Sequence, residues 1–194
     1  MDTESWYSVT PEKIAEYTAR KMRDFNRNPE LTVVDGFSGV GGNTIQFAKN
    51  FENVYSVEID PAKAEMQKNN SEIYQVAPKI TQLVKDFLLV SAEDIQSPKS
   101  QISIFSSPPW GGIDYSTQQF YSLFTSVTPN IVHILDQSFQ LGNSLCLMLP
   151  KNTLMSELVI LCSRAAKKHG KPGPNRVHFD HSLIGTPHSL TLNP

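Results

Sequence analysis

Short apolar runs alternate with helical patterns along most of the 194-residue chain, and this alternation limits its fold more than any other feature. The apolar runs cover residues 31–35, 54–60, 79–84, 102–107 and 144–150. Helical patterns cover residues 10–25, 41–51, 61–74, 129–140 and 154–168. Such alternation predicts an α/β fold, with a mostly parallel sheet covered by helices on both faces. The tail from residue 176 predicts a final antiparallel hairpin.

Local signals predict how two of the helices begin. Thr10 is expected to cap the first helix, with Pro11 at its first position. Asp60 and Pro61 are expected to play the same parts for the helix at 61–74.

Length and composition predict a single domain of residues 1–194, with a helical element at 1–29 and a core at 30–194. No apolar run approaches the ~18 residues of a membrane span. The acidic, polar N-terminus resembles neither a signal peptide nor a transit peptide. Cys146 and Cys162 lie in apolar stretches without metal-ligand spacing, so we expect core thiols in an intracellular, reducing compartment.

Charge is unevenly distributed, although the net charge is only −2. Through Pro150 there are 11 Lys and Arg against 17 Asp and Glu, whereas from Lys151 onward there are 6 against 2. A basic C-terminal quarter on an acidic body can present one positive face to a polyanion. The alternative is that residues 164–176 form a solvated helix end and loop.

The turn after the first apolar run reads DGFSGVGGNT, residues 35–44. Clustered glycines let the backbone approach a ligand closely and tolerate positive φ. Their spacing differs from the dinucleotide pattern G-x-G-x-x-G, and an acidic residue, Asp35, opens the turn. This arrangement suits a ligand with a cationic amine, such as S-adenosylmethionine. The alternative is a tight turn that serves packing alone.

Further acidic residues follow the next strands, where open α/β sheets bind their ligands. Glu58 lies 23 residues beyond Asp35, in a position to accept hydrogen bonds from both ribose hydroxyls. Asp86, after the third strand, is placed to contact an adenine amine, and a plain surface aspartate is the alternative.

The segment IFSSPPWGGID, residues 104–114, follows the fourth strand. Its prolines fix φ and remove backbone donors, so it neither continues the strand nor begins an ordinary helix turn. With the glycine turn and Glu58, this Ser-Pro-Pro-aromatic segment resembles the class I S-adenosylmethionine-dependent methyltransferases that act on exocyclic amines of bases. The resemblance implies a Rossmann-like core. It also implies that Ser107 Oγ and the Pro108 carbonyl accept from the target amine, localise its lone pair and aim it at the methyl group.

The resemblance to one family in this class is closer. The segments WYSVTPEKIA, DGFSGVGGNTIQFA, NNSEIY, KDFLL, SSPPWGGIDY and LPKN occur in the order typical of trimethylguanosine synthases. That family adds methyl groups to N2 of the 7-methylguanosine cap of small nuclear and nucleolar RNAs, giving 2,2,7-trimethylguanosine. The resemblance implies S-adenosylmethionine contacts at Asp35, Phe37, Gly39, Gly41, Asn43, Thr44, Glu58 and Asp86. It implies catalytic roles for Ser107, Pro108 and Trp110, substrate contacts at Trp110, Tyr115, Lys151 and Asn152, and no metal.

Trp110 fits this substrate, because 7-methylguanine carries a delocalised positive charge and an indole is the best neutral partner for a cation. The alternative is that Trp110 fills a gap under the loop. Trp6 is interpreted as a hydrophobic staple before the first helix, with a second aromatic near the cap as the alternative. Ser38 replaces a cysteine that is frequent in the family. Lys151 replaces the usual arginine, so a cap phosphate would meet a point charge there, or other basic residues such as Arg164.

The resemblance also implies partners and a compartment. We expect 7-methylguanosine-capped RNA, RNP or snoRNP proteins, no membrane, and a nuclear location in the nucleolus or nuclear bodies, with the cytoplasm as a second compartment. One alternative is a methyltransferase for another base amine, such as internal guanine N2 or adenine N6, which the PPW and SVTPE segments argue against. The other is a catalytically silent cap- or RNA-binding protein, which the intact glycine turn argues against.

Overall fold

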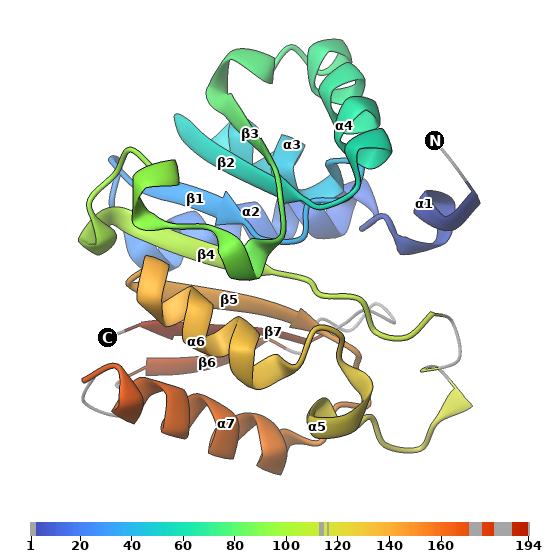
Figure 1. Ribbon diagram of the computed structural model, residues 1–194, viewed down its shortest axis with the longest axis vertical. Coiled ribbons are helices and arrows are strands. Elements are labelled where there is room, and N and C mark those ends of the chain that lie inside the picture. The colour runs from blue at the N-terminus through green and yellow to red at the C-terminus, as the bar shows by residue number, and fades with distance from the viewer. Residues whose placement is uncertain (1–2, 113–114, 116, 171–175, 181–187, 194) are drawn as a thin grey trace.

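A seven-stranded sheet lies at the centre of the computed structural model, which describes residues 3–112, 115, 117–170, 176–180 and 188–193 (Figure 1). The strands are β1 Thr32–Asp35, β2 Asn53–Glu58, β3 Ile80–Val84, β4 Ile102–Ser106, β5 Ser144–Leu149, β6 Arg176–Asp180 and β7 His188–Asn193. Their order in the sheet is β3-β2-β1-β4-β5-β7-β6. β1 to β5 run parallel, whereas β7 is antiparallel to both β5 and β6. The predicted mostly parallel sheet with an antiparallel C-terminal pair is confirmed.

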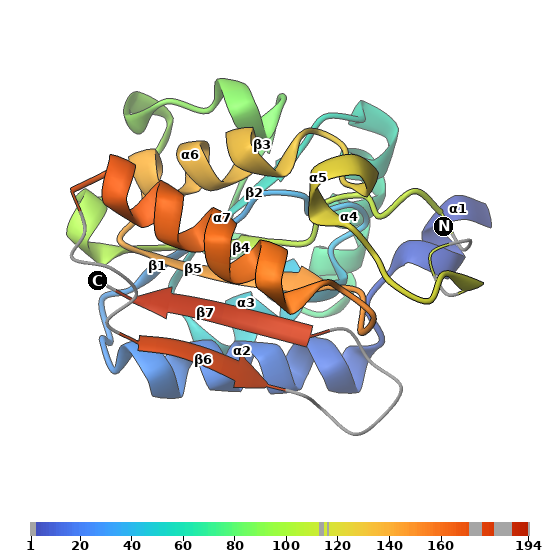
Figure 2. The ribbon, with the colours of Figure 1, turned by 90° about the horizontal axis from the view of Figure 1, so that it is seen from below.

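Helices cover both faces of this sheet, with α2 on one side and α6 and α7 on the other (Figure 2). The α-helices are α1 Thr3–Ser8, α2 Glu12–Asn26, α3 Gly42–Asn50, α4 Pro61–Ile73, α5 Leu123–Ser126, α6 Ile131–Leu141 and α7 Met155–Lys168. Short 3-10 helices are η1 Ala77–Lys79, η2 Phe87–Leu89, η3 Ala92–Asp94 and η4 Lys99–Gln101. The α/β fold is confirmed, while the division at residues 29 and 30 within one domain stays a prediction. Among the described residues, no helix combines the length and apolar character needed to cross a bilayer.

Each face of the sheet has its own hydrophobic cluster. Val33 of β1 and Phe105 of β4 pack with α2 and α3, whereas the neighbouring residues Val34 and Ile104 pack with α6 and α7. All four side chains are buried. Strands covered on both faces need apolar residues at successive positions, which explains the continuous apolar runs of the sequence.

The two cysteines lie in these clusters, as predicted. Cys146 packs on the α2 and α3 side, and Cys162 packs on the α6 and α7 side. Burial raises the pKa of the Cys162 thiol to about 12. Such a thiol stays protonated at neutral pH, which makes it an inert core residue.

The beginning of α4 matches its prediction. Asp60 is the cap residue and accepts a hydrogen bond from the Ala62 backbone N–H at 2.8 Å, with Pro61 at the first helical position. A side-chain acceptor at this position satisfies one of the amides that have no partner inside the helix.

The prediction that Thr10 caps the first long helix is wrong. α2 begins at Glu12, and its cap residue, Pro11, makes no side-chain capping bond. Thr10 Oγ1 instead accepts from Asn43 Nδ2 at 2.8 Å. The Thr10 hydroxyl therefore makes a tertiary contact with α3 and does not cap α2.

The interpretation of Trp6 as a hydrophobic staple is also wrong. Trp6 lies on α1, a six-residue helix, and is 69% exposed. A staple requires burial against the helix that follows, and Trp6 does not have it.

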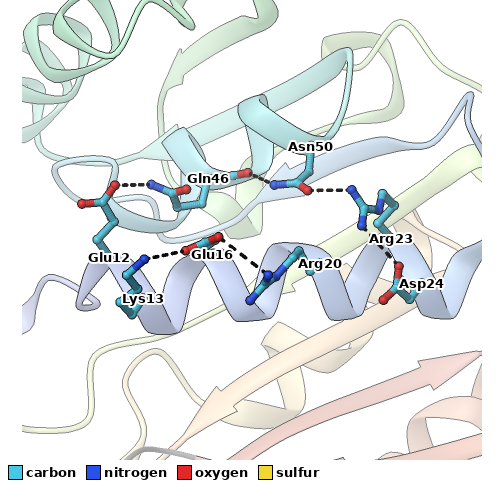
Figure 3. Close-up of polar contacts among 8 residues, drawn as sticks. All are labelled: Glu12, Lys13, Glu16, Arg20, Arg23, Asp24, Gln46 and Asn50. Atoms are coloured by element: carbon cyan, nitrogen blue, oxygen red, sulfur yellow. Dashed lines mark hydrogen bonds and ion pairs between the residues drawn. The ribbon is translucent and has the colours of Figure 1, made fainter.

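α2 packs along α3, and polar side chains join the two helices (Figure 3). Gln46 Nε2 donates to Glu12 Oε1 at 3.3 Å, and Arg23 Nη1 donates to Asn50 Oδ1 at 3.1 Å. These contacts fix the helix that follows the glycine turn, and so they position one side of the candidate site.

Candidate active site at the carboxyl ends of the strands

The glycine turn joins the end of β1 to the beginning of α3. Gly39 has φ +52° and Gly41 has φ +93°, both in the left-handed region that favours glycine. A Cβ added at Gly41 would lie 2.8 Å from Gln67 Cγ, whereas one added at Gly39 would meet nothing within 4 Å. Gly41 therefore packs closely against α4, and its contact with the cofactor stays a prediction, while the backbone at Gly39 faces open space that a ligand can use.

Asp35 is buried directly under this turn. Its Oδ2 accepts from Thr44 Oγ1 at 2.6 Å, and its Oδ1 has no hydrogen-bond partner among the described residues. Burial raises the pKa of Asp35 to about 7, the Thr44 hydroxyl and the backbone amides of Phe37 and Thr44 oppose this rise in part, and the negative charge of Glu58 adds to it. A buried carboxylate with a free oxygen lacks a donor, and the ammonium group of S-adenosylmethionine fits that need.

Glu58 ends β2, also buried, and its carboxylate is fixed by the backbone. Oε2 accepts from the Gly39 N–H at 2.7 Å, and Oε1 accepts from the Asp60 N–H at 2.9 Å. Glu58 thus holds the glycine turn in shape as well as adding negative charge beside it. Each carboxylate oxygen can accept a second bond, so its contact with the ribose hydroxyls stays a prediction.

Three other predicted cofactor residues have structural partners. Asp86 caps η2 by accepting from the Leu88 N–H at 2.9 Å, and the ring of Phe37 packs on Phe87 with centroids 5.5 Å apart. Asn43 is buried, and its Nδ2 donates a hydrogen bond to Thr10 Oγ1. Their contacts with the cofactor stay predictions.

The loop after β4 leaves the sheet beside the glycine turn. β1 and β4 are paired so that Asp35 lies opposite Phe105, and the Gly36 N–H donates to the Phe105 carbonyl at 2.9 Å. Ser107 is half-buried and Pro108 is buried. The fold therefore brings the predicted cofactor turn and the predicted catalytic loop to the same edge of the sheet (Figure 1).

Trp110 lies at the meeting point of the two hydrophobic clusters and is half-buried. Its ring meets Tyr115 edge-on, with centroids 5.2 Å apart and an interplanar angle of 87°. Its indole Nε1 is buried and has no hydrogen-bond partner in the described part of the chain. Trp110 thus packs against the core and retains partial exposure, and its stacking on the cap stays a prediction.

The remaining predicted substrate residues come from the segment after β5. Asn152 Nδ2 donates to the Tyr115 carbonyl at 3.0 Å and to the Gln118 carbonyl at 2.8 Å. Lys151 is exposed beside it. The structure therefore joins Trp110, Tyr115 and Asn152 in one cluster.

Gln67 supports the site from α4 and was not predicted from the sequence. Ser38 Oγ donates to Gln67 Oε1 at 2.9 Å, and the Gln67 side chain packs against Gly41. A buried glutamine on a helix with polar neighbours gives no sequence signal, because its role depends on how α4 lies over the turn.

No group of three or more His, Cys, Asp or Glu that could hold a metal ion occurs within the described ranges.

Comparison with solved structures identifies the class of fold. Magnesium protoporphyrin IX methyltransferase from Synechocystis, solved with bound SAM, superposes with a TM-score of 0.65 at 13% identity, over 94% of this chain and 79% of that one. TYW2 of M. jannaschii, solved in complex with AdoMet, gives a TM-score of 0.55 at 18% identity, over 91% of this chain and 74% of that one. The fold is that of a class I methyltransferase.

Sequence comparison narrows this class. Residues 30–179 match the RNA cap guanine-N2 methyltransferase family. Trimethylguanosine synthase of Schizosaccharomyces pombe is 41% identical, over 89% of this chain and 70% of that protein. Trimethylguanosine synthase of Saccharomyces cerevisiae is 34% identical, over 87% of this chain and 52% of that protein. The chain belongs to the RNA cap guanine-N2 methyltransferase family.

Proposed function

We propose that this protein transfers methyl groups from S-adenosylmethionine to N2 of the 7-methylguanosine cap of small nuclear and nucleolar RNAs, giving 2,2,7-trimethylguanosine. The observation that carries the proposal is the placement of the Trp110 loop beside the buried Asp35 turn, on a chain of the cap guanine-N2 methyltransferase family. The relatives named trimethylguanosine synthase support the choice of product.

The residues of the glycine turn hold the cofactor in this proposal. Asp35 Oδ1 accepts from its ammonium group, the open backbone at Gly39 receives its amino-acid part, and Glu58 accepts from its ribose hydroxyls. Bound there, S-adenosylmethionine supplies an electrophilic methyl group.

The loop after β4 prepares the nucleophile. A base amine is a poor nucleophile because its lone pair is delocalised into the ring. Ser107 Oγ and the Pro108 carbonyl accept from the two N–H bonds of this amine, which fixes its orientation and favours charge developing on the nitrogen. Trp110 stacks on the cationic purine and keeps it from tilting.

RNA recognition and location extend the proposal. The exposed Lys151 lies next to the Trp110 cluster and neutralises a cap phosphate. RNP or snoRNP proteins bring the enzyme to its substrates in the nucleus, in the nucleolus or nuclear bodies, with the cytoplasm as a second compartment.

Methyl transfer to 7-methylguanosine diphosphate, compared with guanosine diphosphate, tests the proposal. Stacking of a desolvated cation on an indole contributes about 2 kcal/mol, so the methylated substrate should have a kcat/KM higher by tens-fold. Equal kcat/KM for both substrates would favour the internal-guanine alternative. Cofactor binding without transfer to either substrate would favour the silent binding protein.

A further inference from the structure

After the Trp110 loop, the chain runs beside the segment that follows β5. Backbone hydrogen bonds join these two segments. The Tyr121 N–H donates to the Asn152 carbonyl at 2.8 Å, and the Leu154 N–H donates to the Tyr121 carbonyl at 3.0 Å. Tyr121 is buried, and its hydroxyl donates to the Ser126 carbonyl at 3.0 Å. These backbone bonds hold one end of the segment that follows the Trp110 loop, at Tyr121.

The Asn152 side chain holds the other end. Its single Nδ2 group donates to the carbonyls of both Tyr115 and Gln118, so both amide protons are used. Tyr115 in turn presents its ring edge-on to Trp110, with 5.2 Å between centroids. The contacts therefore form a continuous path from Asn152 through Tyr115 to Trp110.

Asn152 is itself firmly placed. It follows the buried residue Pro150 at the end of β5, and the neighbouring Thr153 hydroxyl donates to the Pro150 carbonyl at 2.6 Å. The side chain thus connects the end of β5 to two backbone carbonyls of the segment that follows Trp110.

We propose that Asn152 is a positioning residue that fixes the Trp110 ring through the carbonyls of Tyr115 and Gln118. The inference rests on the proposed function, in which Trp110 stacks on 7-methylguanine. It differs from the substrate contact implied by the sequence in what the amide protons do, because both are already used within the protein, whereas the buried Oδ1 has no partner among the described residues. Only an amide of this length supplies two donors here, and an aspartate of the same shape supplies none.

The test combines kinetics with the fluorescence of Trp110. The chain contains two tryptophans, so the Trp6→Phe background leaves Trp110 as the single reporter. In this background, Asn152→Asp should increase acrylamide quenching of Trp110 in the ligand-free protein, and Asn152→Gln should have a smaller effect. With Trp6 present, Asn152→Asp should lower kcat/KM for 7-methylguanosine diphosphate by roughly tenfold or more, since misplacement of a reactant by a small distance has effects of this size.

The Kd of S-adenosylmethionine should change less than twofold in these variants. Ser144→Ala is the matched control, since it removes a buried hydrogen-bonding hydroxyl from the opposite end of β5 and should alter neither Trp110 quenching nor kcat/KM. In the unaltered protein, the two side-chain amide protons of Asn152 should exchange slowly with solvent by NMR, which tests the contacts without any substitution.

Four outcomes would overturn the inference. Reduced kcat/KM with unchanged Trp110 quenching would indicate direct contact between Asn152 and the cap. Unchanged kcat/KM, or fast exchange of the Asn152 amide protons, would show that the loop does not depend on this side chain. The same losses in Ser144→Ala would indicate general destabilisation. If the unaltered enzyme methylated neither guanosine diphosphate, the proposed function would fail, whereas quenching and exchange would still decide the positioning role.

Discussion

At the scale of single residues, burial decides what the predicted side chains can do. Asp35 stands at the strand end that the sequence indicated, yet its chemistry follows from being buried with one oxygen unpartnered. Glu58 shows the same dependence, because the amides of Gly39 and Asp60 fix its carboxylate. Neither the burial nor the partners could be predicted from residue type and spacing.

Asp35→Asn should remove a pH dependence of stability in the cofactor-free protein. The pKa of Asp35 is raised from 3.8 to about 7, so the folded state binds its proton more tightly than the unfolded state. Its contribution to stability is complete below about pH 4 and is lost as pH rises toward 7. Urea unfolding at several pH values should therefore show the difference between the two proteins changing across this window. A constant difference would contradict the raised pKa.

The same residue should make cofactor affinity depend on pH. Protonated Asp35 cannot attract an ammonium group, so the Kd of S-adenosylmethionine should rise as pH falls from 7.5 to 5.5. The α-amino group of the cofactor stays protonated in this range, because α-amino groups titrate at about pH 8. Asp35→Asn should bind roughly tenfold more weakly at pH 7.5, as for loss of a hydrogen bond between charged groups, with little pH dependence. Calorimetry measures both, and a pH-dependent Kd that persists in the variant would argue against Asp35.

Trp110 and Ser107 lie on one loop, but their substitution should affect different kinetic constants. Trp110→Leu keeps apolar volume in the cluster and removes the π face, so KM for 7-methylguanosine diphosphate should rise about tenfold or more. Ser107→Ala removes an acceptor whose value grows as charge develops on the amine, so kcat should fall while cap binding is nearly unchanged. Each variant serves as the control for the other. Full kcat in Ser107→Ala, or unchanged KM in Trp110→Leu, would refute the roles assigned to this loop.

At the scale of elements, the glycine turn depends on the N-terminal segment before residue 30, which packs against α3. α2 is joined to α3 by the Glu12–Gln46 and Arg23–Asn50 contacts (Figure 3). The segment between α1 and α2 packs directly on Gly42, where an added Cβ would lie 2.7 Å from Val9 Cγ2. The N-terminal helices therefore support the cofactor side of the site.

Gly42→Ala should consequently separate this segment from α3. The new methyl group would also approach the Thr10 carbonyl at 3.2 Å, which is backbone and cannot move freely. Overpacking of this kind reduces the free energy of unfolding by about 1–3 kcal/mol, and thermal or urea unfolding would measure it. Asn69→Ala, at an exposed position of α4, should change it by less than ~0.5 kcal/mol. Equal stability of both variants would show that the packing at Gly42 is unimportant.

At the scale of the whole molecule, the α/β class, the nature of both turns and their place at the strand ends could all be predicted from the sequence. Apolar periodicity and glycine or proline geometry are local properties, so they can be read from neighbouring residues. The tertiary structure alone decided which strands are adjacent, and with them the pairing of β1 with β4 that joins the two turns. It also decided that Thr10 contacts Asn43, that Trp6 is exposed, and that Asn152 holds the Trp110 loop. These contacts join residues distant in sequence, and they depend on how the helices and strands pack together.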